Sequence, residues 1–210
     1  MEIFERNGDT GKQGHSLNCL ACALYQDGQL DATEEAASRA IQLLSEKGQE
    51  FRICPSHLIL GRLYEVMGET EKAFYHLKAT LGITSRFGWN NWLSFWAHMG
   101  LARVFAVEDK FDDAHTHLEQ AKSLPVNNAF NQGSLALLQA RVYYEQRRLA
   151  DATSEALRAL GIFEELGIQE DIESCRDFLR GVEEKAKGCD TSEVSLWERC
   201  HILHLLTLPS

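Results

Sequence analysis

The sequence predicts an all-α protein built from stacked helix pairs, and three observations point to this fold class. Equivalent small residues, Thr33, Ala73, Ala114 and Ala152, mark four copies of one block spaced by 40, 41 and 38 residues. Within the blocks, apolar residues recur at helical rather than strand-like spacing. A pair of amphipathic helices cannot bury its apolar stripe alone, so the copies must stack on one another.

The four copies predict helix pairs near residues 15–47, 52–87, 91–124 and 130–166. The second helix of each pair begins near an acidic residue, which favours the positive end of the helix dipole; these are Asp31, Glu69, Asp112 and Asp151. Gly48, Gly88 and Gly167 follow the pairs, as helix C-termini prefer. Pro125 interrupts the chain between the third and fourth copies.

The segments at either end of the repeats differ from them. Residues 1–14 contain three glycines and are predicted to be a flexible lead-in. Residues 169–187 carry an apolar stripe and a charged face, which predicts a helix that caps the array. Residues 189–210 form an atypical apolar tail, with three alternatives for 191–208: a further docked helix, a disordered or non-native extension, or a segment for self-association.

The recurring pattern, clearest at Leu60, Gly61, Tyr64, Gly68 and Ala73, resembles the tetratricopeptide repeat. The resemblance covers roughly residues 15–187 and implies a right-handed superhelix of four helix pairs with a capping helix. Residues 152–180 are also similar to the repeat arms of fungal signal-transducing NTPases of the NACHT or NB-ARC type. The chain departs from the repeat pattern at His57, His98 and Gln139, where apolar residues are usual.

Composition excludes several classes of partner. The 210 residues carry a formal net charge of −10, which disfavours nucleic acid and anionic membranes as partners of the surface as a whole. The sequence shows neither an apolar run of membrane-spanning length nor a secretory leader. Six cysteines without a loop framework fit a reducing compartment, so we expect a cytoplasmic protein.

We expect no enzymatic activity, cofactor or metal, because no motif combines the groups that such chemistry needs. The segment from Gly8 to Lys12 lacks the spacing of a phosphate-binding loop. Cys19 and Cys22 have redox spacing but lie within a predicted helix. Cys200, His201 and His204 have no second ligand pair at zinc-finger spacing.

A row of arginines is the strongest candidate for a binding site. In tetratricopeptide arrays the first helix of each unit lines a concave groove, and alignment of the copies places Arg62, Arg103 and Arg141 at one groove position. The same face carries Asn18, Tyr25, Trp96 and Tyr144. Guanidinium groups at one register suit capture of carboxylate or phosphate. We expect Trp96 to contact a ligand and Trp92 to be buried.

Two interpretations of this face stay open. The arginines bind an acidic or phosphorylated peptide, or they pair with neighbours such as Glu65, Glu108 and Glu145 and leave the groove solvated. The first predicts a non-catalytic module that binds a peptide or protein segment. The second predicts a structural or sensor arm of a larger signalling assembly, with no ligand in its groove.

Overall fold

A computed structural model describes residues 10–88, 91–126 and 128–186. In these ranges the regular structure consists of α-helices and one short 3-10 helix, without a strand, so the all-α prediction is confirmed. Internal contacts divide the chain into two compact units, Met1–Leu101 and Ala102–Ser210.

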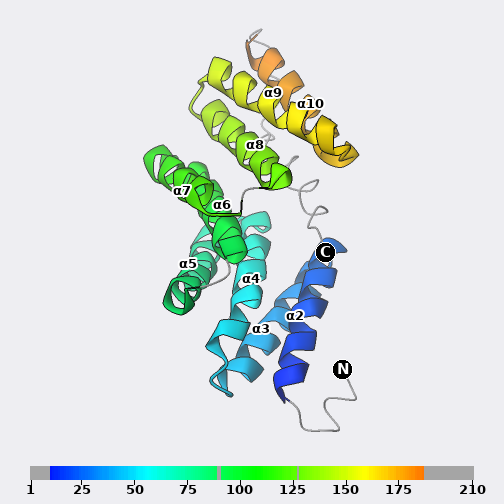
Figure 1. The fold of residues 1–210 in the computed structure, drawn as a ribbon, viewed down its shortest axis with the longest axis vertical. Helices are drawn as coiled ribbons and strands as arrows, with labels where there is room; N and C mark the ends of the chain where they lie inside the picture. Colours follow the sequence, from blue (N-terminus) through cyan, green and yellow to red (C-terminus); the bar gives the residue numbers. More distant parts are fainter. Residues whose placement is uncertain (1–9, 89–90, 127, 187–210) are drawn as a thin grey trace. The chain divides into compact units, whose positions relative to one another are not determined.

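The first unit contains two complete helix pairs (Figure 1). Helix α2 (Thr10–Gln26) packs against α3 (Leu30–Ser45). The 3-10 helix η1 (Glu50–Ile53) leads into α4 (Cys54–Val66), which packs against α5 (Thr70–Phe87). Because α2 also contacts α4, the first helices of consecutive pairs touch each other.

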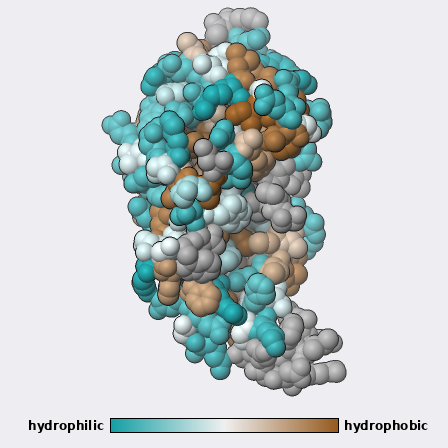
Figure 2. Space-filling model, in the orientation of Figure 1, coloured by the Kyte–Doolittle hydropathy of each residue, from teal (hydrophilic) through white to brown (hydrophobic). Residues whose placement is uncertain are grey.

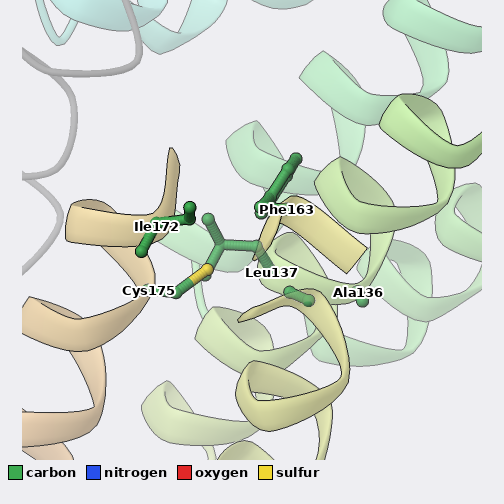
Figure 3. Close-up of a cluster of buried hydrophobic side chains, with 6 residues drawn as sticks. Ala136, Leu137, Phe163, Ile172 and Cys175 are labelled. Carbon is green, nitrogen blue, oxygen red and sulfur yellow. The ribbon is translucent and has the colours of Figure 1, made fainter. Parts of the chain in front are cut away.

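The boundary between the units lies within α6 (Asn91–Val107), and the second unit continues with four more helices. These are α7 (Phe111–Ser123), α8 (Ala129–Glu145), α9 (Leu149–Leu166) and α10 (Gln169–Ala186). Helix α10 occupies the segment predicted to be a capping helix. Its Ile172 and Cys175 join a buried cluster with Leu137 and Phe163 of α8 and α9 (Figure 3).

The predicted flexible lead-in over 1–14 is wrong for its last five residues, because α2 begins at Thr10; residues 1–9 lie outside the described part. The reason is visible at Gly14, where an added Cβ would lie 2.6 Å from Cγ of Leu44. This glycine therefore permits close approach of α2 to α3 instead of providing flexibility. Gly133 has the same role in the fourth copy, where an added Cβ would lie 2.8 Å from the Phe163 ring.

The same turn joins the two helices of every pair. One residue of each turn has a left-handed backbone, with φ of 71° at Gly28, 73° at Gly68, 57° at Asp109 and 59° at Arg147. The next residue donates its N–H to the carbonyl five residues earlier, at 2.9 Å in all four copies. This is the hydrogen bond of a Schellman-type helix end, which favours glycine at the left-handed position. The four turns thus recur at one register, as the sequence alignment requires.

We predict that exchanges at the turn position change stability in opposite directions. Gly68→Ala forces a side chain into the left-handed region and should destabilise the protein by roughly 1 kcal/mol, and Arg147→Gly should stabilise it by a similar amount. Gly82→Ala is the matched control, because Gly82 lies in α5 with open space around it. Urea unfolding checks the prediction, and equal effects of Gly68→Ala and Gly82→Ala would contradict it.

Candidate functional site

The seven side chains predicted to line an open groove are buried. Their exposed fractions lie between 2% and 8% for Asn18, Tyr25, Arg62, Trp96, Arg103, Arg141 and Tyr144. The expectation that they face solvent is therefore not met. In the first unit the physical reason is the contact between α2 and α4, because first helices that touch each other cover the face that they share.

Asn18 links consecutive helix pairs of the first unit. Its Nδ2 donates a hydrogen bond to the carbonyl of Arg52 in η1, at 2.8 Å. Its Oδ1 accepts a hydrogen bond from the hydroxyl of Ser56, which is fully buried on α4. Both ends of the amide are thus engaged inside the protein, so Asn18 holds α2 against the next pair.

Arg141 of the second unit has partners on α10. Its Nη2 donates to the hydroxyl of Ser174 at 3.3 Å. The pKa of Asp171 is raised to about 6, chiefly by burial and also by the charge of Glu170, while Arg141 opposes both effects. Asp171 is still largely ionised at pH 7 with such a pKa, so it supplies a counter-charge to Arg141 within the unit.

Tyr144 also belongs to the contact between α8 and α10. Its ring packs edge-on against Phe178, with 5.6 Å between the ring centroids. The ammonium group of Lys185 lies 4.0 Å from the centroid of the Tyr144 ring. Tyr144 therefore helps to fix the capping helix, and Phe178 is a core residue that the predicted stripe of α10 did not include.

Arg62 of the first unit is surrounded differently. Its guanidinium carbon lies 5.4 Å from the ring centroid of Tyr25 on α2 and 5.5 Å from that of Trp96 on α6. The side chain is only 6% exposed, and its Nη1 atom is buried without a hydrogen-bond partner. Within the described residues no carboxylate lies within ion-pair distance of it. We call these three side chains the Arg62 clamp.

The two rings compensate the buried charge of Arg62 but not its unpaired donor. A desolvated cation–π contact contributes about 2 kcal/mol, so two rings contribute about 4 kcal/mol, which is close to the roughly 3–5 kcal/mol cost of an uncompensated buried charge. The Nη1 donor without an acceptor costs about 1–3 kcal/mol. An anion that accepts a hydrogen bond from Nη1 would therefore add stability that the rings do not supply.

The thiol of Cys22 lies near Arg62 but does not balance its charge. Burial raises the pKa of Cys22, the neighbouring Cys19 raises it further, and Arg62 lowers it without reversing the direction. The thiol thus stays neutral at pH 7. Cys22 is half-buried and Cys19, one turn earlier on α2, is exposed.

The predicted burial order of two tryptophans is reversed. Trp92 is 36% exposed, whereas Trp96 is almost fully buried. The two rings meet edge to face, with 6.3 Å between their centroids. Helical spacing placed both on one stripe, but only Trp96 reaches the guanidinium of Arg62.

A histidine pair joins α4 to α5. Of the two, only His57 was noticeable in the alignment of the repeats, as a polar residue at a position where apolar residues are usual. The Nδ1 atoms of His57 and His76 lie 2.9 Å apart, so one ring donates a hydrogen bond to the other. The pKa of each is lowered to about 4, by burial at both rings and in addition by the charge of His76 at His57. Tyr64 stacks on His76 and donates its hydroxyl hydrogen bond to Glu34 of α3.

Metal ligands, membrane spans and the C-terminal tail are the remaining features of the sequence analysis. No group of three or more His, Cys, Asp or Glu that could hold a metal occurs among the described residues. None of the helices described is long and apolar enough to cross a membrane. Cys200, His201, His204 and the whole 189–210 tail, with its predicted self-association segment 191–208, lie outside the described part of the chain.

The visible surface is mostly hydrophilic, interrupted by smaller hydrophobic areas (Figure 2). The most exposed large apolar side chains are spread over α5, α6 and α9, at Tyr75, Val107 and Leu157. Among the described residues, these three side chains thus lie on three different helices.

Comparison with known proteins assigns no relationship. No protein-family model matches this chain, and no curated protein matches it.

We predict that Asn18→Ala lowers stability. It removes the donor to the Arg52 carbonyl and leaves the buried Ser56 hydroxyl without its acceptor, a loss of about 1–3 kcal/mol. Denaturant unfolding measures the change. An unaltered urea midpoint would show that the contact between α2 and α4 does not depend on this amide.

We also predict that stability falls as the pH drops from about 6.5 to 4. The folded-state pKa values of His57 and His76 lie below the ordinary 6.5, so the unfolded chain binds more protons in this interval. The contribution of the two histidines to the free energy of unfolding is then fully present above pH 6.5 and decreases below it.

His76→Asn removes one titrating ring and should flatten this pH dependence, and His15→Asn, on the exposed part of α2, is the control. Chemical unfolding at a series of pH values measures the slope. Equal slopes for the wild type and His76→Asn would contradict the prediction.

Proposed function

We propose that the chain is a non-catalytic interaction module of tetratricopeptide-like helix pairs that binds a segment of another protein. The observation that carries the proposal is the helix-joining turn, which recurs four times with the same left-handed residue and the same hydrogen bond. Stacked copies of one structural unit provide extended surfaces for partners, and this is their common use.

The right-handed superhelix and the kinship to repeat arms of NACHT or NB-ARC proteins belong to the same proposal. The regular repeat that both require is supported by the sequence register and by equivalent contacts within the first and fourth pairs, Gly14 with Leu44 and Gly133 with Phe163. A cytoplasmic location is likewise proposed from the free cysteines.

An acidic partner segment is favoured at one of the three arginines. Arg141 is compensated within its own unit by Ser174 and Asp171. Arg62 contacts two aromatic rings, and no carboxylate of the described residues lies within ion-pair distance of it. A complementary negative group on the partner therefore stabilises Arg62 more than Arg141.

A structural or sensor arm is the second candidate function. Burial of all seven predicted groove side chains favours it, because Asn18 and Tyr144 hold neighbouring helices together. Such an arm positions a neighbouring domain without a ligand in its groove.

Affinity capture from an extract of the source organism distinguishes the two functions. For a module, we predict that a partner co-purifies in a fixed ratio and slows amide hydrogen exchange in α2 and α4. A helical protein of equal net charge is the control for nonspecific capture. Failure to retain any partner above this control would reject the module and favour the arm.

A further inference from the structure

The Arg62 clamp is a buried cation that contacts two aromatic rings and has one unpaired N–H group. Its guanidinium carbon lies over the rings of Tyr25 and Trp96, which come from two different helices. Nη1 points to no acceptor among the described residues. The other two arginines of the predicted row do not combine these features, since Arg141 bonds to Ser174 and Arg103 has further interactions of its own.

We propose that the Arg62 clamp is a binding site for one oxyanion, a carboxylate or phosphate group. The inference rests on the proposed interaction function in one respect only. That function supplies the source of the oxyanion, which is a side chain of the partner segment. An oxyanion would supply the two things that Arg62 lacks in the fold, which are a negative charge and a hydrogen-bond acceptor.

The geometry restricts how the oxyanion binds. The N–H groups of a guanidinium lie in its plane, and a carboxylate or phosphate meets them edge-on. The Tyr25 and Trp96 rings pack against the guanidinium from other helices. They restrict its motion before the ligand arrives, which reduces the entropy lost on binding.

Access is best on the side of Cys22. Tyr25 and Trp96 are almost completely buried, whereas Cys22 is half-buried and close enough to Arg62 to sense its charge. The oxyanion therefore enters past the Cys22 thiol and lies beside it when bound. Cys19, exposed one turn earlier, provides an internal comparison.

A purely structural role for Arg62 makes the opposite prediction for stability. If the guanidinium holds the rings together, a neutral side chain of similar length should weaken the fold. If Arg62 is an unoccupied anion site, the same change removes a buried N–H donor without an acceptor and should strengthen the fold. One substitution, Arg62→Met, separates the two roles.

The test combines thermal unfolding without ligand and calorimetric titration of the full chain. The probes are hexaglutamate with blocked ends, hexaglutamine with blocked ends, and inorganic phosphate. Arg39→Met on α3 is the control, because it removes the same charge at an exposed position. We expect Arg62→Met to raise Tm by about 2–4 °C and to weaken oxyanion binding at least tenfold, with Arg39→Met like the wild type.

The comparison between the probes identifies the source of the oxyanion. Tighter binding of hexaglutamate than of phosphate indicates an acidic segment, and the reverse indicates a phosphorylated segment or a free anion; either supports the site. The proposal is overturned if the wild type binds neither anion, if Arg62→Met binds as well as the wild type, or if Arg62→Met lowers Tm. If a partner is nevertheless captured from extract, the interaction function stands and only the Arg62 inference fails.

Thiol labelling supplies a second, independent readout. With N-ethylmaleimide followed by mass spectrometry, a bound oxyanion should slow modification of Cys22 at least threefold and leave Cys19 unchanged. The anion both covers the Cys22 thiol and disfavours its reactive thiolate. Equal slowing at the two cysteines, or none at Cys22 at saturating probe, would place the anion elsewhere.

Discussion

Each helix pair of this chain carries an apolar stripe that its own two helices do not cover, and within each unit this stripe packs against the next helix along the chain. Close packing of the two helices of one pair requires small residues where they cross. Gly14 of α2 against Leu44 of α3 and Gly133 of α8 against Phe163 of α9 are such points, and a β-carbon at either glycine would collide with its neighbour. The recurring left-handed turn keeps the two helices of each pair in the same register. Within each unit, the site described above depends on this packing.

Close packing also determines what the inner face can do. Where first helices touch, polar side chains that would line an open groove become links between helices, as Asn18 does. Arg141 fits this pattern because α10 provides Ser174 and a counter-charge. Arg62 does not fit it, because its neighbours in the described chain are aromatic rings. A buried arginine with an N–H group that lacks an acceptor is better explained by binding than by folding.

The sequence was sufficient to predict helices and turns because they depend on local patterns. Apolar spacing located the helix pairs, and the left-handed turn residues Gly28, Gly68, Asp109 and Arg147 recur at the same repeat spacing. It could not predict burial of the arginine face, which depends on how closely first helices approach each other. It misjudged residues 10–14 because a glycine that permits contact looks the same as one that permits flexibility.

The histidine pair shows the same limit. His57 was recognisable as a departure from the repeat pattern, but its partner lies nineteen residues away on the next helix. Only the packing of α4 on α5 brings the two rings together. Likewise Trp92 and Trp96 share a stripe in sequence, and their difference in exposure follows from which ring meets Arg62.

Hydroxyl-radical footprinting of Trp92 and Trp96 tests the closed inner face most directly. The side chains lie one turn apart on α6, so differences in local dose are small. The account predicts that Trp92, at 36% exposure, is oxidised several times faster than Trp96, at 3%. Oxidation of Trp96 at the rate of Trp92 or faster would show an open face and contradict burial of the Arg62 clamp.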